Sequence, residues 1–215
     1  MARVYLFKRF ERFWHWTQAA LIVFLLVTGF DIHGTYSIMP WHDAVRLHRF
    51  GAWTLITLWV FAIFWHFTTG EWKQYIPTTN RLIDVANYYA FGIFKPGAHH
   101  PFGVTQLQKH NPLQRLAYLG LKLFISPVLW ISGLLYMYFK DPFTAAVVQP
   151  IIHTFGLTLG FVAIVHTFAA FCMLLFFIGH VYMGFTGHPP YAYVKAMITG
   201  WGDAEEDPAA QNEKG

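Results

Sequence analysis

The chain has 215 residues, of which 55% are hydrophobic, 20% aromatic and only 12% charged. This composition excludes an ordinary soluble domain and indicates that lipid is the main solvent of the protein. The formal net charge of +4 comes from basic residues that flank apolar runs, where they orient a membrane protein, so the charge does not indicate binding to nucleic acid.

Four stretches are long and apolar enough to cross about 30 Å of hydrocarbon as helices of about 20 residues. The first follows several basic residues and lacks a small-residue cleavage site, so we expect a retained helix and not a signal peptide. The sequence thus predicts an all-α integral membrane domain over residues 1–201, a four-helix bundle with spans at about 13–30, 47–67, 116–139 and 157–185. Residues 202–215 are rich in Asp, Glu, Ala, Gln and Asn, which predicts a flexible tail.

The loop between the second and third spans is the most basic of the three. It contains Lys73, Arg81, Lys95, Lys109 and Arg115. Because basic loops stay in the cytoplasm, the sequence predicts a multi-pass protein with this loop and both termini cytoplasmic. Within the loop, residues 81–94 could form a short interfacial helix, although irregular packing fits the sequence nearly as well.

Twelve histidines are unusual in so apolar a chain, because ionisable groups at membrane depth are costly and mark ligands or pathways. His166 and His180 are 14 residues apart in the last span, near one helix face and about 21 Å apart along it. Counting inward from the helix ends places His48 level with His166, and His15 level with His180. Six-coordinate heme iron takes one axial ligand from each side. These levels therefore predict a bundle enclosing two b hemes, with the iron of one bound by His48 and His166 and that of the other by His15 and His180.

His66 is an alternative to His15, because it shares a helix face with His48, 18 residues earlier. Its distance of about 27 Å from His48 along the helix matches the spacing in the last span less well. His66 also lies in an interfacial Trp-His-Phe sequence, where a snorkelling ring explains it. Arg49, next to His48, is predicted to bind a heme propionate through its planar guanidinium.

Two other classes of protein fit part of this pattern. A heme-free, proton-coupled transporter would use the intramembrane histidines as a proton relay, although no repeat with broken helices is apparent. A histidine-ligated metal enzyme in the membrane would need clustered histidines, and the adjacent pair His99-His100 has no partner motif nearby.

Several short segments, taken in order, resemble one known family. They are residues 12–16 (RFWHW), 46–51 (RLHRFG), 109–115 (KHNPLQR), and His166 with 178–183 (IGHVYM). Their order and spacing, over nearly all of residues 7–201, resemble the gamma-type cytochrome b subunits of membrane-bound formate dehydrogenases, nickel-iron hydrogenases and thiosulfate reductases. The ligand positions of that family fall on the four histidines already paired by depth.

The resemblance also implies a cytoplasmic quinone site, with Asn111 at the position of the family's quinone contact. Its amide is both donor and acceptor. Asn111 has a second explanation as the N-cap of the third span, with Pro112 at the first helical position and Gln114 completing a capping box. The formate dehydrogenase branch has a small residue where this chain carries Leu113.

By this resemblance, the protein is a subunit of the bacterial inner membrane that carries single electrons between a periplasmic iron–sulfur or multiheme partner and ubiquinone or menaquinone. The single cysteine, Cys172, cannot supply an iron–sulfur or nickel ligand set. Substrate-level catalysis is therefore expected on another subunit of a hetero-oligomer. The partner's substrate sets the direction of electron flow. The heme ligands of this chain determine neither that substrate nor the direction.

Overall fold

A computed structural model of the chain describes residues 3–92, 95, 109–185 and 191–203. It divides into two compact units, Met1–Arg115 with Gly184–Gly215 and Leu116–Met183. Among the described residues, four helical segments are long and apolar enough to cross a membrane, namely Arg9–Ile32, Trp41–Thr69, Pro112–Tyr138 and Leu159–Gly184. The prediction of a helical membrane protein with four spans is confirmed, and the first three spans begin earlier than expected.

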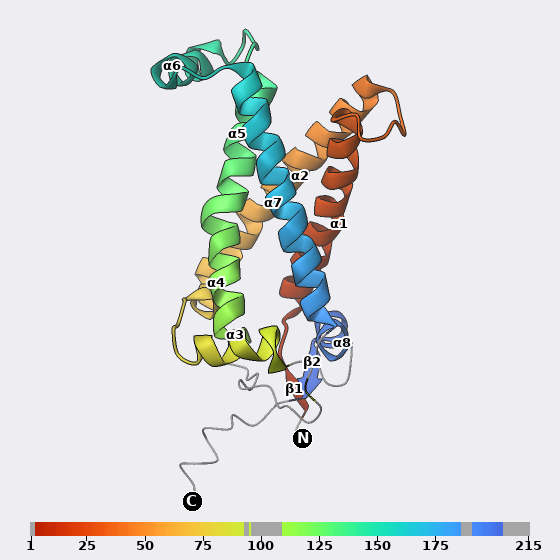
Figure 1. The fold of residues 1–215 in the computed structure, drawn as a ribbon, viewed down its shortest axis with the longest axis vertical. Helices are drawn as coiled ribbons and strands as arrows, with labels where there is room; N and C mark the ends of the chain where they lie inside the picture. The colour runs from red at the N-terminus through yellow and green to blue at the C-terminus, as the bar shows by residue number, and fades with distance from the viewer. Residues whose placement is uncertain (1–2, 93–94, 96–108, 186–190, 204–215) are drawn as a thin grey trace, which may run out of the picture. The chain divides into compact units, whose positions relative to one another are not determined.

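The first unit is built on a hairpin of two long helices. Helices α1 (Arg9–Ile32) and α2 (Trp41–Thr69) pack against each other, with α2 inclined to α1 (Figure 1). The start of α1 is capped by Glu11, whose carboxylate accepts the backbone N–H of Lys8 at 2.7 Å. A Cβ on Gly51 would lie 2.9 Å from the ring of Phe24, so glycine allows the close approach of the two helices.

After α2 the chain continues through the 3₁₀ turn η1 (Glu71–Tyr75) and the short helix α3 (Leu82–Ala90). Helix α3 buries Val85 and Tyr88, which lie on one face because they are three residues apart. Of the two predicted alternatives for residues 81–94, the helix is the one observed over Leu82–Ala90. The pair His99-His100 lies outside the described residues.

The described ends of the chain are joined within the first unit. Strand β1 (Arg3–Tyr5) pairs antiparallel with β2 (Trp201–Asp203), and helix α8 (Ala192–Thr199) precedes β2. Gly200, between α8 and β2, has φ of 89°, and a Cβ there would lie 2.6 Å from the ring of Tyr5. This turn therefore requires glycine. Residues 202 and 203, assigned to the tail by their composition, belong to β2, and residues 204–215 lie outside the described residues.

The second unit contains the remaining two spans from Leu116 to Met183. The span that begins at Pro112 consists of α4 (Pro112–Gly120), a π-helical turn η3 (Leu121–Ile125) and α5 (Ser126–Tyr138). Pro127 has no backbone N–H to donate to the carbonyl of Leu123, which accounts for the irregular turn just before it. Helix α6 (Ala145–Phe155) links this span to α7 (Leu159–Gly184).

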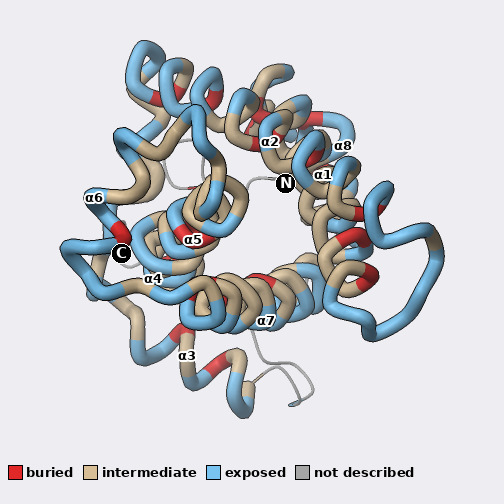
Figure 2. The backbone as a smooth tube through the Cα atoms, turned by 90° about the horizontal axis from the view of Figure 1, so that it is seen from above, coloured by how far each residue is buried: buried red, intermediate tan, exposed pale blue. Residues whose placement is uncertain are grey.

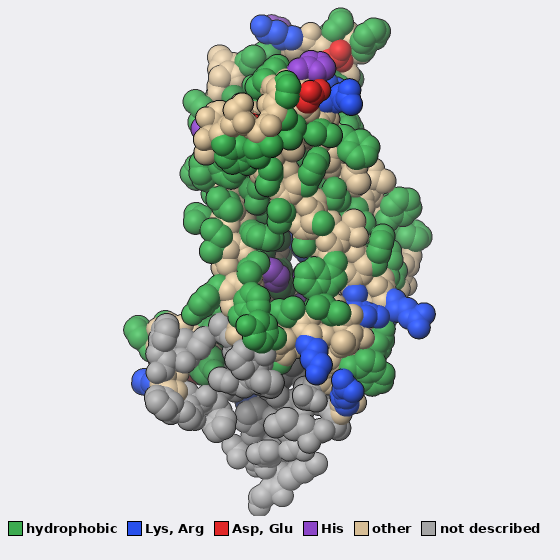
Figure 3. Space-filling model, turned by 90° about the vertical axis from the view of Figure 1, so that its right-hand side faces the viewer, with side chains coloured by type: hydrophobic (Ala, Val, Ile, Leu, Met, Phe, Trp, Pro, Cys, Tyr) green, Lys and Arg blue, Asp and Glu red, His purple; other side chains and the backbone are tan. Residues whose placement is uncertain are grey.

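Many large apolar side chains on the spans are exposed. Phe64 is 67% exposed, and Phe168 and Leu175 are each 70% exposed. Buried residues are scattered singly along the helices (Figure 2), and hydrophobic side chains dominate the face seen in Figure 3. Soluble proteins rarely expose so much apolar surface, so lipid must cover it.

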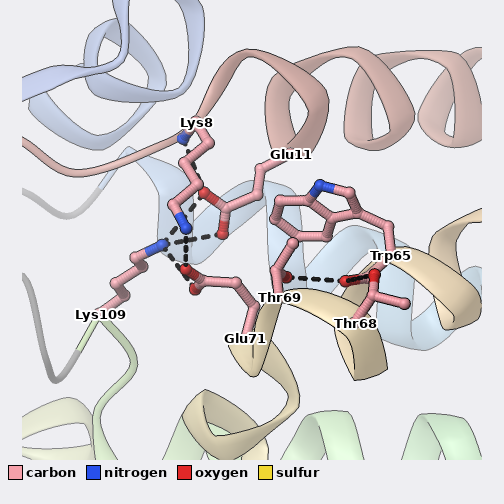
Figure 4. Close-up of polar contacts among 7 residues, drawn as sticks. All are labelled: Lys8, Glu11, Trp65, Thr68, Thr69, Glu71 and Lys109. Atoms are coloured by element: carbon pink, nitrogen blue, oxygen red, sulfur yellow. Dashed lines mark hydrogen bonds and ion pairs between the residues drawn. The ribbon is translucent and has the colours of Figure 1, made fainter.

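A cluster of four charges lies in the first unit, where α1, η1 and the segment before α4 meet (Figure 4). The Nζ of Lys109 lies 2.9 Å and 3.0 Å from the two carboxylate oxygens of Glu11 and 3.1 Å from Glu71. Lys8 lies 2.7 Å from Glu71. The side chains of Lys109 and Glu11 are only 4% and 9% exposed, so each charge depends on the other for its solvation.

The outer members of this cluster have altered acidity. The hydrogen bond to Glu71 raises the pKa of Lys8 above its usual 10.5. Burial alone would raise the pKa of Glu71, but hydrogen bonds from Lys8 and Lys109 outweigh burial and lower that pKa below its usual 4.5. The cluster's contribution to stability is therefore lost as the pH falls through the lowered pKa of Glu71 or rises through the raised pKa of Lys8.

We expect Lys109→Met to lower the free energy of unfolding by about 3 kcal/mol, because it leaves the Glu11 carboxylate buried without its cation. Adding Glu11→Gln should recover part of the loss, since the uncompensated charge is removed and the helix cap is kept. Unfolding in mixed micelles with increasing SDS, followed by circular dichroism, measures both effects. Lys140→Met, at an exposed lysine, is the control, and equal losses in the two lysine variants would contradict the prediction.

Candidate functional site

His48 on α2 is held by two consecutive residues of α1. Its Nδ1 lies 2.9 Å from the hydroxyl oxygen of Thr28, and a Cβ on Gly29 would lie 3.3 Å from its Cε1. The Thr28 hydroxyl donates to the carbonyl of Phe24 at 2.9 Å. Because a hydroxyl has one proton, its oxygen accepts from Nδ1–H of His48. Nε2 then carries the lone pair that a metal ligand needs.

His166 on α7 is held in the same way by two consecutive residues of α5. Its Nδ1 lies 3.1 Å from the hydroxyl oxygen of Ser132, and a Cβ on Gly133 would lie 3.0 Å from its Cε1. The Ser132 hydroxyl donates to the carbonyl of Val128 at 2.5 Å, so it too accepts from the ring. In each unit, therefore, a histidine on one span has Nδ1 against a hydroxyl of the preceding span, and Nε2 is the nitrogen that would form a ligand bond.

The two other predicted ligands, His15 and His180, are half-buried on α1 and α7. The ring of His180 is stacked on Phe176, with centroids 5.9 Å apart, and lies 6.1 Å from the ring of Tyr118. His15 makes edge contacts with Trp14 and Trp16, its neighbours in the chain.

The distance between ligand levels is the same in each unit. His15 lies 13 residues before Thr28, the residue that contacts His48, which is about 20 Å along α1. His166 and His180 lie 14 residues apart on α7, or about 21 Å. Each unit thus offers histidines at two levels that are about 20 Å apart.

His66 differs from the sequence-based expectation. Its side chain is buried, with 8% exposed, so the predicted snorkelling is wrong. Nδ1 donates to the carbonyl of Ala62 at 2.6 Å, and the rings of Trp14, Trp65 and Tyr75 lie 5.1–5.5 Å from the His66 ring. The contact with Trp14 places His66 level with His15, because α2 is inclined to α1. The distance along α2 therefore does not distinguish His66 from His15 as a candidate partner of His180, whereas the burial of the two side chains does.

Asn111 is buried at the start of α4, with 4% exposed. Its side-chain oxygen accepts the backbone N–H of Gln114 at 2.8 Å, and the Gln114 side-chain oxygen accepts that of Asn111 at 3.0 Å. The predicted capping box is confirmed. The amide nitrogen of Asn111 lies 3.4 Å from the hydroxyl of Tyr89. A row of rings, His66, Tyr75 and His110, with centroids 5.5 Å and 5.3 Å apart, leads from α2 to the residue before Asn111.

Sequence reasoning missed Thr28 and Ser132. A signal was present, since a hydroxyl residue followed by glycine occurs in the interior of the spans only at Thr28-Gly29 and Ser132-Gly133. It also missed the acidic half of the charge cluster, Glu11 and Glu71, which stand one and two residues before a basic residue and therefore look solvated. Arg49, predicted from its place beside His48, is exposed on α2, and its role stays a prediction.

Comparison with known proteins identifies the family. The profile described as prokaryotic cytochrome b561 matches residues 6–200. The chain belongs to this family. A relative from Escherichia coli (strain K12) named "Putative cytochrome YdhU" is 29% identical over 204 residues, covering 93% of this cytochrome and 74% of the relative. No solved structure matches the cytochrome.

Family membership makes the chain a membrane cytochrome b that binds heme b and takes part in electron transfer, which argues against the heme-free transporter. The described residues fit such a group. Nδ1 of His48 and Nδ1 of His166 each contact a hydroxyl, so Nε2 is the ring nitrogen that would bind the iron, and the adjacent glycines leave room for the two rings. When bound, heme supplies an iron that carries one electron. The described residues hold no group of three or more His, Cys, Asp or Glu side chains placed for a non-heme metal ion.

We expect Gly133→Ala to displace His166, because the new Cβ would lie 3.0 Å from the ring. Heme binding at that histidine should weaken by roughly tenfold, as is typical when groups that orient a ligand are disturbed. Gly29→Ala should have a smaller effect, since its Cβ would lie 3.3 Å from His48. The rate of heme transfer to apomyoglobin measures the loss.

The control is Gly160→Ala on α7, where a Cβ would meet nothing within 4 Å. If Gly133→Ala retains heme as well as Gly160→Ala does, close packing of glycine against His166 has no part in ligand placement.

Proposed function

We propose that this cytochrome carries electrons across the membrane between a periplasmic redox partner and the quinone pool through two b hemes. His48 and His166 bind the iron of one heme, and His15 and His180 bind that of the other. The observation that carries the proposal is the equal separation of the histidine levels, about 20 Å on α1 and about 21 Å on α7. Two levels that match in separate units suit two macrocycles, one toward each membrane surface.

We favour His15 over His66 as the partner of His180. The His66 ring is buried among three aromatic rings, whereas His15 is half-buried, like the three other proposed ligands. A ligand must present its ring edge to a large flat group, and the enclosure of His66 leaves less room for one.

Asn111 is the proposed quinone contact. Its Oδ1 serves the helix cap, while its amide N–H can donate to a quinone carbonyl. The charge cluster brings ionisable groups close by, since Lys109 stands two residues before Asn111. Reduction of a quinone to a quinol takes up two electrons and two protons, so a site at the cytoplasmic surface would draw its protons from that side.

The proposed location is the bacterial inner membrane, with both termini in the cytoplasm. The basic loop supports this orientation, and the pairing of β1 with β2 keeps both described ends together, as an even number of spans requires. Arg49, beside His48, is proposed to bind a propionate of the heme that faces the periplasmic partner. That partner is an iron–sulfur or multiheme subunit of a formate dehydrogenase, hydrogenase or thiosulfate reductase type of complex.

A pyridine hemochrome assay on the purified protein tests the heme assignment. We expect two b hemes per chain in the parent and one in His48→Ala and in His15→Ala, because each substitution removes one axial ligand. His66→Ala and the exposed-residue control His153→Ala should keep both hemes. Loss of a heme from His66→Ala but not from His15→Ala would transfer the ligand role to His66, and a colourless parent would refute the proposal.

Asn111→Ser separates the cap from the quinone contact, because serine is an equally good N-cap but lacks the amide donor. We expect reduction of the hemes by duroquinol to slow by about tenfold, the loss typical of one hydrogen bond of about 1.4 kcal/mol, with little change in unfolding. Stopped-flow absorbance measures the rate. Asn87→Ser, at an exposed position of α3, is the control, and an unchanged rate in Asn111→Ser would exclude Asn111 from the quinone site.

A further inference from the structure

Two dipeptides, Thr28-Gly29 on α1 and Ser132-Gly133 on α5, make the same set of contacts in separate units of the chain. In each, the hydroxyl bonds the carbonyl four residues earlier and the Nδ1 of a histidine on the next span. In each, the following glycine lies against Cε1 of that histidine. In both pairs, the helix that faces the histidine ring carries a hydroxyl that accepts a hydrogen bond, followed directly by a glycine that has no side chain.

The bond to the helix carbonyl alone is ordinary. Thr57, Thr68 and Thr69 on α2 make the same backbone bond, as such residues often do in membrane helices, but they are exposed. Thr28 and Ser132 are 1% and 4% exposed, and each is joined to a histidine. Burial and the histidine contact set these two hydroxyls apart.

The two parts of each pair act differently on the ring. The hydroxyl already donates its hydrogen bond to a backbone carbonyl. Its oxygen can therefore only accept a hydrogen bond from Nδ1–H of the histidine, which fixes the tautomer of the ring. The glycine lets the ring approach the helix closely, which limits its rotation about Cβ–Cγ. A ring whose N–H is engaged also becomes a stronger electron donor to a metal at Nε2, which stabilises the oxidised iron.

We infer that Thr28-Gly29 and Ser132-Gly133 are matched positioning pairs that orient the two axial histidines of a single heme and lower its reduction potential. The inference rests on the proposed function, since it requires His48 and His166 to share one iron. The heme of His15 and His180 is then tuned independently, which lets the chain set the potential difference between its two electron carriers.

Redox titration of the purified cytochrome tests this, with the two hemes resolved as separate waves. Thr28→Val and Ser132→Ala should each raise the ferrous-to-ferric ratio of the same heme by about threefold at a given applied potential. This corresponds to a reduction potential that is higher by about 30 mV, at 59 mV per tenfold change. The double variant should change it by roughly tenfold if the two bonds act independently. The other wave should not move, and the low-spin electron paramagnetic resonance signal of the affected heme alone should shift.

Matched controls separate positioning from packing. Thr57→Val removes a backbone-bonded threonine from α2, and Ser126→Ala removes a buried serine beside the π turn; both should titrate like the parent. Thr28→Ser keeps the hydroxyl and should restore the parent potential. If neither redox wave moves in Thr28→Val or in Ser132→Ala, the inference is overturned. The proposed function would still be supported in that case if the parent binds two hemes. Shifts in different waves would overturn the shared heme and with it the proposed pairing.

Discussion

A histidine inside a membrane has two ring nitrogens to satisfy, and this constraint organises the structure. Hydrocarbon offers neither donors nor acceptors, so a nitrogen without a partner is costly. His48 and His166 place Nδ1 on a hydroxyl of an adjacent helix, so Nε2 is the nitrogen that would bind iron in the proposed function. Because the hydroxyl is itself bonded to its own helix, each histidine is fixed to a backbone and not to another mobile side chain.

The rest of each unit can be understood from the positions of these histidines. Close approach of the histidine rings to the helices at Gly29 and Gly133 brings the hydroxyls within reach. Many large apolar side chains of the spans are exposed, where lipid would cover them. Some polar groups that are buried away from the histidines are paired with one another. The cluster around Lys109 and Glu11 is the clearest case, since it ties the start of α1 to the segment that leads into α4.

Membership in the prokaryotic cytochrome b561 family explains why so many residues of a small chain position histidine side chains. Electron transfer needs the iron held in nearly unchanged geometry through both oxidation states, which favours ligands restrained from a second helix. The proposed quinone site would have the opposite requirement, because a quinone must exchange. There the structure offers a buried amide at a helix start, Asn111, near a charge cluster and a row of rings.

The spans, the histidine levels and the cap at Asn111 could be predicted from the sequence, because hydropathy, the helical rise and capping residues act along a single helix. Contacts between helices could not. That Thr28 and Ser132 meet histidines depends on how neighbouring helices pack, and that His66 is level with His15 depends on the inclination of α2. The burial of Glu11 likewise depends on an ion pair with Lys109, which lies 98 residues later in the sequence. The sequence by itself therefore determined which residues lie at which depth, whereas the tertiary structure decided which nitrogen of each histidine is engaged and by what, since that depends on the crossing of helices.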